Sequence, residues 1–495
     1  MNTDIVNIIF GLKVRQARLD SKLSLSQLAK RCELSPSYIT EIEKGRKHPK
    51  ADKIMKIAEV LGKSYDELVS LKLAPSLTSL EALLASHLLQ QFPFEEFGLE
   101  VNNLVNLFTR TPNRASALAR TIIEIGRQYD MKGEHFLRAA LRAYQEIREN
   151  YFPDIEKKAA NFAQNYNFEG ELPLSLTTLE TVIKDEFSYS LDRNHLADDP
   201  ILSIYRSVYI PGKKPKLLLN SALRDSQIKF LLARELGYQY LNLKKRANTS
   251  APDTVDSFQQ VLNDFKASYF AGALLIPQSM ILEDVKAFFR SETWHEAHLL
   301  GLLGKYDVTP EMLLYRISEL MPQFFGIKPH FVRFNGARGN YELIKQLNMN
   351  KLLLPSSGTV LDEHHCRRWL AVGLLREMSE YKERVNGQPL VGVQISEFLR
   401  SKERVFSFGF VRPLALSPHL GSSVTMGFSI TPEVTDTIRF INDSAIPVKL
   451  IHETCERCPL TAEECQERAV EPKIYETEQR AKKRTEALQN LVEQL

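Results

Sequence analysis

The N-terminal part of the chain repeats short amphipathic segments in which apolar residues recur at intervals of three and four. That spacing places the apolar side chains on one face of an α-helix. Ser35 suits the cap of the third segment, Pro36 suits a first helical position, and Gly45 suits the position after a helix. The five segments lie at residues 9–17, 24–32, 35–45, 51–62 and 64–71. The pattern predicts a domain of five short helices over 1–72.

Residues 73–160 continue with the same helical spacing and predict a helical connector. Two short breaks, at Thr111–Asn113 and Met131–Gly133, divide it. Its periodic stretches lie at residues 79–92, 101–110, 115–129 and 134–152.

Between residues 161 and 325 the pattern becomes mixed. Apolar and polar residues alternate over 203–211 and 214–220, on both sides of a Pro-Gly-Lys-Lys turn, which predicts a β-hairpin. A helix is expected directly afterwards, over 221–241, and a second one that ends at Pro277. This stretch therefore predicts an α+β domain.

The remaining chain predicts a second α+β domain over 326–475, because strand-like runs at 404–414 and 422–430 lie at its centre. A highly charged helical tail is expected over 476–495. The predicted fold class is multidomain and mainly α, with two α+β parts.

Composition fits a globular protein of about three domains: 495 residues, 43% hydrophobic and 25% charged. The net charge of +3 does not by itself indicate nucleic-acid binding, but residues 1–72 hold fourteen Lys and Arg against nine Asp and Glu. That excess predicts an anionic partner for the first domain. No apolar run reaches the ~18–20 residues that span a bilayer, and no basic leader precedes the first apolar stretch. Five cysteines, an odd and sparse set, favour a reducing cytoplasm.

The sequence from Ser24 to Leu68 resembles the phage-repressor (Xre/Cro) type of helix-turn-helix domain, most specifically at SYITEIEKG and LGKSYDEL. The resemblance implies that residues 35–44 form a recognition helix in the major groove of an operator. It also implies a buried structural pair of Arg18 and Glu43. Leu25 stands where the family often has a glutamine, so that phosphate contact is expected to be missing.

By position in that helix, three residues are expected to face base edges and four to face sugar and phosphate. The first group is Ser37, Thr40 and Glu41, and the second is Tyr38, Lys44, Arg46 and Lys47. Because a two-fold operator needs a dimer, the connector is expected to supply dimer contacts. The alternative is a helical protein-interaction module that has lost DNA binding. Cys32 is expected to be a small packed residue.

The stretch Phe230–Leu243 has the form of a zinc-peptidase helix, in which two histidines four apart bind one metal. Glu235 is present, but Arg234 and Tyr238 occupy the histidine positions. The order of hairpin, this helix and a helix ending in LLIP resembles the ImmA/IrrE metallopeptidase family, in a zincin-like fold. The acid nearest to the expected third ligand is Asp264. We expect no catalytic zinc, because two of the three ligands are gone.

Three interpretations remain for this helix: an active peptidase, a structural relic, and a pocket that now binds a ligand. In the third, Arg234 offers a fork of donors to a carbonyl or carboxylate, and Tyr238 offers an aromatic wall. Basic clusters flank the predicted pocket and are candidates for phosphate contacts, or else ordinary solvated surface. They are Lys213, Lys214, Lys216, Lys244, Lys245 and Arg246.

Three C-terminal cysteines, Cys455, Cys458 and Cys465, have the spacing C-x2-C-x6-C, and Cys366 lies far upstream. Four thiolates can hold a structural zinc or an iron–sulfur cluster. The alternative is one buried cysteine and three free thiols.

The whole order of domains resembles the short-chain fatty acyl-CoA regulators, most specifically at RAYQEIRENYFPDIE, HHCRRW and CER with CQERA. These are transcription factors of acetate and propionate metabolism, some of which bind acyl-CoA and carry a [4Fe-4S] cluster. The cysteine pattern departs from the family: Phe428 stands at a Gly-Cys position, His452 replaces a cysteine, and Cys458 is additional.

The resemblance implies a cytoplasmic homodimer that binds a double-stranded DNA operator and responds to a short-chain acyl-CoA or a similar anionic metabolite. The rival hypotheses are a peptidase that acts on a partner repressor and a DNA-bound scaffold without a ligand.

Overall fold

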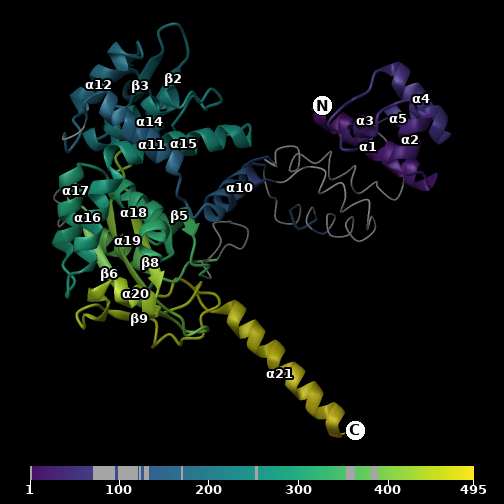
Figure 1. The fold of residues 1–495 in the computed structure, drawn as a ribbon. Helices are drawn as coiled ribbons and strands as arrows, with labels where there is room; N and C mark the ends of the chain where they lie inside the picture. The colour runs from purple at the N-terminus through teal and green to yellow at the C-terminus, as the bar shows by residue number, and fades with distance from the viewer. Residues whose placement is uncertain are drawn as a thin grey trace. The chain divides into compact units, whose positions relative to one another are not determined.

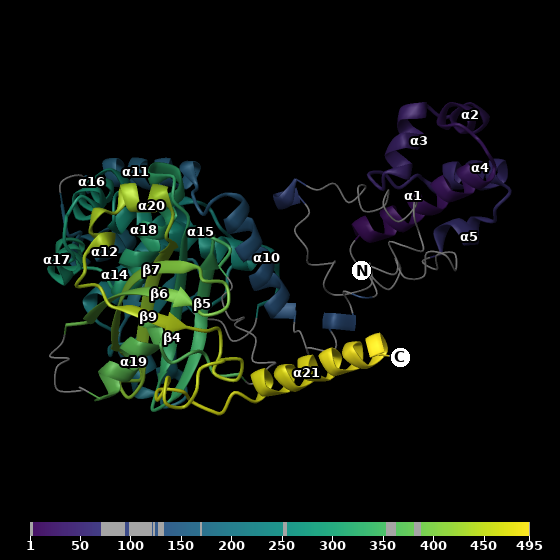
Figure 2. The same ribbon diagram turned by 90° about the horizontal axis from the view of Figure 1, so that it is seen from below.

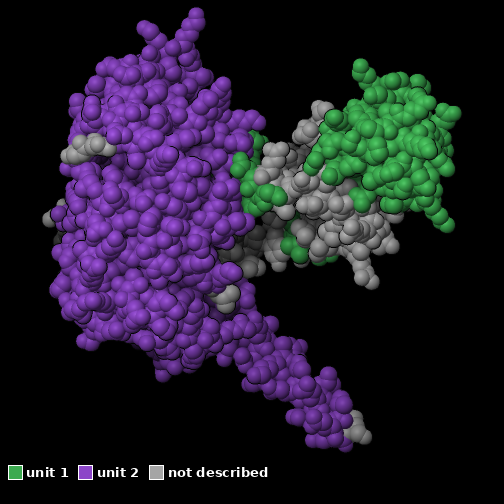
Figure 3. All heavy atoms as spheres, viewed as in Figure 1, with its two compact units in different colours: residues 1–140, 256–258 green, residues 141–255, 259–495 purple. Residues whose placement is uncertain are grey.

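The computed structural model describes residues 3–70, 95–98, 121, 124–126, 133–168, 171–250, 255–352, 363–380 and 388–494. It contains two compact units, Met1–Ala140 with Asp256–Phe258, and Leu141–Val255 with Gln259–Leu495 (Figure 3). Most of the predicted connector at 73–160 lies outside the described residues. Its described parts before α10 include the short 3-10 helix η2 (Glu95–Phe97). The predicted dimer contacts on that connector stay a prediction, as do the finer domain boundaries.

The first unit begins with the five predicted helices (Figure 1). They are α1 (Thr3–Asp20), α2 (Leu25–Arg31), α3 (Pro36–Glu43), α4 (Ala51–Leu61) and α5 (Tyr65–Val69). Their apolar faces form one core that includes Phe10, Leu28, Ile39, Ile57 and Leu68. Cys32 is buried in this core, as expected of a packed residue.

Local chemistry sets the ends of these helices. The Ser24 and Ser64 side chains accept from the third residue of their helices and complete capping boxes. Ser35 accepts from the backbone N–H of Tyr38. A close approach of α1 and α3 needs a glycine, because a Cβ on Gly11 would lie 2.2 Å from the carbonyl oxygen of Ile42.

The second unit contains α11 (Pro153–Asn165), which follows α10 (Gly133–Ile147). The sequence predicted one helix over 134–152, but the structure ends it at Ile147. Glu149 and Asn150 take left-handed backbone angles there, with φ of 51° and 53°. Asn favours that region, and Pro153 disfavours a helical residue before it, so a turn replaces the last predicted helical residues.

A small sheet and a group of helices follow. The sheet has the order β1-β3-β2, and its β2–β3 pair is the predicted antiparallel hairpin. Its strands are β1 (Ser190–Asp192), β2 (Ser207–Ile210) and β3 (Lys216–Leu219). The accompanying helices are α12 (Leu176–Asp185), α13 (His195–Asp198), η3 (Leu202–Ile204), α14 (Asp225–Tyr240), α15 (Phe258–Leu275), α16 (Gln278–Phe289), α17 (Glu296–Tyr306) and α18 (Pro310–Phe325).

The C-terminal part is built on a six-stranded sheet with the order β5-β4-β8-β7-β6-β9, antiparallel except for the parallel pair of β6 and β9. The strands are β4 (Pro329–Ala337), β5 (Asn340–Asn348), β6 (Leu390–Phe398), β7 (Arg404–Pro413), β8 (Gly421–Ser429) and β9 (Val448–Ile451). The helices of this part are α19 (Leu370–Glu380), α20 (Pro432–Thr437), η6 (Arg439–Asn442) and α21 (Lys473–Gln494).

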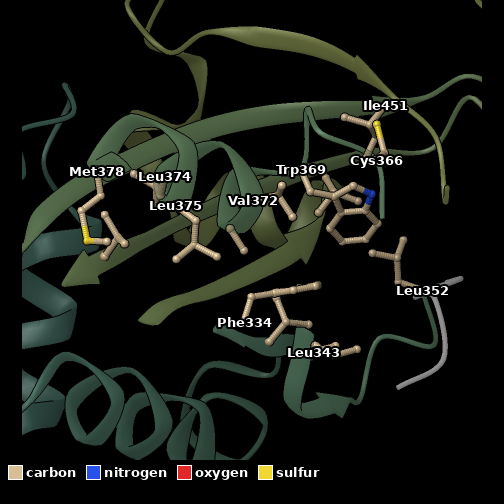
Figure 4. Close-up of a cluster of buried hydrophobic side chains, with 14 of the residues drawn as sticks. Phe334, Leu343, Leu352, Cys366, Trp369, Val372, Leu374, Leu375, Met378 and Ile451 are labelled. Atoms are coloured by element: carbon tan, nitrogen blue, oxygen red, sulfur yellow. The ribbon is translucent and has the colours of Figure 1, made fainter. Parts of the chain in front are cut away.

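Both faces of this sheet are covered by helices, α19 on one side and α16 and α18 on the other (Figure 2). Period-two alternation along each strand supplies the two faces. Val332 and Phe334 of β4 pack toward α19 with Trp369 and Leu375 (Figure 4). Phe331, directly before Val332 and on the opposite face of the strand, packs edge-on to Tyr315 of α18 at 5.2 Å between ring centroids. The predicted charged tail is helical as α21, and none of its described residues is buried.

Candidate functional site

The recognition helix α3 has a buried face and an exposed face. Ile39 and Ile42 are fully buried, which leaves Ser37 exposed and Thr40 and Glu41 partly exposed. The Thr40 hydroxyl donates to the carbonyl of Pro36 at 2.8 Å, and Glu41 pairs with Arg46 at 3.4 Å. The three residues expected at base edges therefore lie on the accessible side of α3.

Cations gather at the end of α3 and the start of α4. Lys44, Arg46 and Lys47 are exposed, as phosphate contacts require. The Lys53 ammonium lies 4.5 Å from the centre of the Tyr38 ring and that of Lys47 lies 5.7 Å from it. The sequence analysis missed Lys53, because its place beside α3 depends on how α4 packs.

A buried ion pair joins α1 to α3. Arg18 donates to both carboxylate oxygens of Glu43, at 2.6 and 3.0 Å, and to the carbonyl of Leu23 at 2.8 Å. This bidentate geometry confirms the expected structural pair and fixes the orientation of the recognition helix.

The two residues at the histidine positions of α14 meet the expected acid of α15. Arg234 is buried and forms an ion pair with Asp264, and the Tyr238 hydroxyl donates to the same carboxylate at 2.9 Å. Gly237 lets the two helices approach, because a Cβ there would lie 3.0 Å from the carbonyl oxygen of Ala267. The structure thus brings together the three residues at which the resemblance implies metal ligands.

Glu235, the one residue kept from the peptidase motif, is also held by an arginine. Arg246 donates to both of its carboxylate oxygens, at 2.5 and 2.7 Å, and the Tyr189 hydroxyl donates at 3.2 Å. The guanidinium of Arg246 lies 3.9 Å from the ring centres of both Tyr209 and Tyr238. Arg246 was expected beside the exposed lysines, but the structure places it within this internal network.

The five predicted lysines are spread over the surface. Lys213 and Lys214 are exposed at the β2–β3 turn, and Lys244 and Lys245 are exposed after α14. Lys216 pairs with Asp192 at 2.9 Å. In the described parts of the chain, none of them forms a hydrogen bond or ion pair with Arg234 or Tyr238.

The structure brings together an arginine cluster that the sequence analysis missed, consisting of Arg206, Arg234, Arg333 and Arg412. Arg206 is exposed at the surface. Protein close to its guanidinium lowers the pKa of Arg206, and the nearby charges of Arg333, Arg412 and Arg234 act in the same direction, against that of Glu311. Arg206 lies directly before β2, and the other three arginines lie on α14, β4 and β7. Because these elements are far apart in the chain, no sequence spacing could have grouped the four residues.

Only part of that positive charge is neutralised. Arg412 forms a bidentate pair with Glu311, at 2.8 and 3.0 Å, while Arg333 donates to the Ser422 hydroxyl at 3.0 Å. Burial disfavours the Glu311 carboxylate, yet Arg412 and Arg333 bring its pKa down to about 2. With Asp264 on Arg234, two carboxylates face four guanidinium groups.

The four C-terminal cysteines are neighbours in the fold. Backbone bonds from Cys366 to Glu453 and from Cys455 to His364 join the distant segments, at 3.2 and 2.8 Å. Burial raises the pKa of Cys366 to about 11, and the thiols of Cys455 and Cys458 contribute. Burial also raises the pKa of Cys458, and the nearby thiols of Cys465 and Cys455 raise it further. Among the described residues, no three or more His, Cys, Asp or Glu side chains are arranged to hold a single metal ion.

The structure shows the surroundings of two residues that stand where the resemblance implies cysteines, His452 and Phe428. His452 is buried and its Nδ1 has no hydrogen-bond partner in the described structure. Phe428 is fully buried on the face of the sheet that α16 and α18 cover, and its ring is edge-on to that of Phe289.

Two family models match the chain. A helix-turn-helix model matches residues 14–68, and a model described as the IrrE N-terminal-like domain matches residues 197–318.

No described helix is long and apolar enough to cross a membrane.

The chain is also similar to proteins that are named as a control protein and as transcriptional regulators. Residues of the first domain are similar to control protein C.BamHI of Bacillus amyloliquefaciens, 40% identical over 68 residues that cover 14% of this chain and 84% of the relative. The HTH-type transcriptional regulator RamB of Mycobacterium tuberculosis is 26% identical over 340 residues, 66% of this chain and 68% of the relative. A solved Mycobacterium tuberculosis transcriptional regulator is similar at 18% identity and a TM-score of 0.46, over 68% of this chain and 93% of that one.

Proposed function

We propose that this protein is a ligand-responsive regulator of transcription. The chain carries an Xre-type helix-turn-helix domain and an IrrE N-terminal-like domain, and it is homologous to HTH-type transcriptional regulators. The protein binds a two-fold DNA operator as a homodimer, and its effector is a short-chain acyl-CoA or a similar anionic metabolite. The arginine cluster is the observation that carries the proposal. Its four positive charges outnumber the two negative charges of Asp264 and Glu311, so the site favours an anion.

A peptidase activity is disfavoured by the same residues. A zinc peptidase needs a metal-bound water that its glutamate activates. Arg234 and Tyr238 are poor zinc ligands, and both bond to Asp264. The carboxylate of Glu235 accepts hydrogen bonds from Arg246 and Tyr189, so its oxygens are already engaged in this arrangement.

The arginine cluster suits an anionic thioester ligand. Guanidinium groups bind phosphate and carboxylate oxygens with paired donors, and their charge polarises a carbonyl. Arg234 is already paired with Asp264, so Arg206 and Arg333 are the members with charge available for CoA phosphates. Tyr238 is buried, and burial raises its pKa, so it remains a neutral donor that limits the acyl length.

Effector binding would be coupled to DNA binding through α15. This helix carries Asp264, which faces Arg234, and Tyr269, which lies about one and a half turns further along. The Tyr269 hydroxyl donates to Glu156 of α11 at 2.6 Å and accepts from the backbone of Phe152 at 3.3 Å. Glu156 also pairs with Arg316 of α18 at 2.6 Å. An effector that draws Asp264 away from Arg234 would shift α15 against these anchors of the connector. Such a shift changes DNA affinity only if the effector prefers one of the two arrangements.

The cysteine set would hold an iron–sulfur cluster, with a structural zinc as the alternative. Four thiolates that lie close together can hold either group. Cys366, Cys455, Cys458 and Cys465 come from two segments that lie near one another in the fold. The Ala469 N–H donates to the Cys455 sulfur at 3.4 Å, a bond that would stabilise a thiolate. When bound, such a cluster supplies redox chemistry and holds the two cysteine segments together.

Calorimetry tests the effector site. Wild type should bind acetyl- and propionyl-CoA, and Arg206→Ala and Arg333→Ala should each bind roughly tenfold or more weakly, because each loses a charge-assisted contact. Arg439→Ala is the matched control, since that exposed arginine pairs with Glu292 away from the cluster. Equal binding by all four proteins would place the effector elsewhere, and no binding by wild type would leave the domain as a relic.

Anaerobic purification tests the cofactor. Broad visible absorbance with iron and sulfide is expected, and it should fall when any of the four cysteines is replaced by serine. Cys32→Ser is the control, because Cys32 lies in the helix-turn-helix core. A colourless protein with about one zinc per chain would favour the zinc alternative, and a stable, metal-free protein would exclude both.

A further inference from the structure

The C-terminal domain contains a second basic site, a groove of about 650 Å³. It lies between the β4–β5 turn, α19 and the segment that follows Cys465. Its volume is within the range of roughly 300–1,000 Å³ that small-molecule and cofactor pockets occupy. Four arginines line it: Arg338, Arg367, Arg376 and Arg468. None of them belongs to the arginine cluster described above.

Carboxylates neutralise only part of the charge of these arginines. Glu380 and Glu467 line the groove, but Glu467 accepts hydrogen bonds from Arg368 at 3.1 and 3.2 Å. Within the described ranges, Arg338, Arg367 and Arg376 form no ion pair. A groove with this excess of positive charge favours an anionic occupant.

Two of the arginines are held in place by the fold. Arg367 is only 7% exposed, donates to the Gly339 carbonyl at 2.6 Å, and lies 4.7 Å from the centre of the Tyr341 ring. Burial lowers the pKa of Arg367, and the charge of Arg376 acts in the same direction. The guanidinium is thus fixed before any ligand arrives, which reduces the entropy lost on binding.

Arg468 carries a donor that lacks an acceptor. Its Nη1 is 3.5 Å from Glu471 and its Nη2 donates to the Leu460 carbonyl, but its Nε is buried without a partner in the described structure. A buried N–H without an acceptor is costly, and a bound oxygen atom would remove that cost.

We propose that this groove binds a phosphorylated small molecule of up to nucleotide size, with its phosphate oxygens on Arg338, Arg376 and Arg468. Arginine is the side chain best suited to this role, because its planar fork binds two phosphate oxygens at once. A small molecule fits better than the DNA backbone, because Arg367 and Arg468 are largely buried rather than presented on a convex surface.

The test is calorimetry on the full chain with pyrophosphate and ADP as probes. Wild type should bind both, and the double variant Arg338→Asn with Arg376→Ala should bind roughly tenfold or more weakly. Asn is chosen because Arg338 has a φ of 51°, a conformation that Asn tolerates. Arg367 is left unchanged, because its burial would make a loss of folding hard to separate from a loss of binding. Arg480→Ala, on the exposed helix α21, removes the same charge outside the groove and should bind like wild type.

Three results would overturn the proposal. One is a wild type that binds neither probe at millimolar concentration, and another is equal binding by wild type and the double variant. The third is an unchanged probe affinity together with weaker sequence-independent DNA binding, which would assign the groove to the DNA backbone. Loss of acetyl-CoA binding in the double variant, with Arg206→Ala unaffected, would instead support this groove and overturn the effector site proposed above.

Discussion

Two buried arginines in this protein face a carboxylate in very different surroundings. Arg18 and Glu43, in the first unit, are 9% and 7% exposed, so both charges are removed from water. Arg234, in the second unit, is 5% exposed, but its partner Asp264 is 37% exposed. The first pair is closed and holds two helices together. The second is open on the carboxylate side, so that water or a ligand can reach it.

The difference separates a structural pair from a candidate functional one. A closed pair can be broken only by leaving a charge in the interior, which is costly. An open pair can exchange partners, because the released carboxylate is solvated. The position at which the resemblance implies a metal thus has a positive centre whose counter-charge is accessible.

The largest effect is expected from breaking the closed pair. Glu43→Gln should lower the free energy of unfolding of the first unit by about 3–5 kcal/mol, because Arg18 is left buried without a full counter-charge. Urea denaturation followed by circular dichroism would measure it. Glu41→Gln, on the accessible side of the same helix, is the matched control. A loss below about 1 kcal/mol would show that the pair is hydrated.

The exposed face of α3 should affect DNA recognition without affecting stability. Ser37→Ala or Glu41→Ala should change the preference at one base pair by about 1–3 kcal/mol, measured by competition binding with substituted operators. Uniform binding to all operators by both variants would mean that other residues face the bases.

The cations that flank α3 should act on all sequences alike. Lys44→Ala with Arg46→Ala should weaken binding to every DNA and reduce the slope of log affinity against log salt by about two, one for each lost phosphate contact. Titration at several salt concentrations measures the slope. Lys63→Ala, beyond α4, is the control that should leave it unchanged, and a double variant that behaves like it would place α3 wrongly on the DNA.

A much smaller effect on stability than that of Glu43→Gln is expected at the open pair. Arg234→Met should cost about 1 kcal/mol or less, because Asp264 can be hydrated and the buried Nε without a partner is removed. The same variant should bind acyl-CoA more weakly, since Asp264 then repels an anion. Denaturation and calorimetry on one preparation separate the two quantities. A stability loss as large as that of Glu43→Gln would erase the contrast between the pairs.

Local sequence signals determined much of the fold. The caps at Ser24 and Ser35 and the apolar spacing were enough to predict α1 to α5, because such signals act within one turn of helix. The β2–β3 hairpin followed from alternation around a Pro-Gly turn. The same signals overextended the helix at Ile147, where the backbone turns at Asn150.

The candidate sites were only partly predictable. Motif spacing identified Arg234 and Tyr238 and proposed Asp264, and the structure brings these three together. Spacing also suggested that Arg246 belongs with the surface lysines, whereas it packs between two tyrosine rings and pairs with Glu235. A run of basic residues does not reveal which member turns inward.

The sequence by itself determined the types of the first two domains, the presence of Arg234 and Tyr238 at the expected histidine positions, and the presence of four C-terminal cysteines. Only the tertiary structure decided which charges meet. Arg206, Arg333 and Arg412 come from separate strands and loops, and Arg338, Arg376 and Arg468 from a turn, a helix and a cysteine loop. Charge–charge interactions depend on distance in space and on burial, and neither quantity is written in the spacing of residues along the chain.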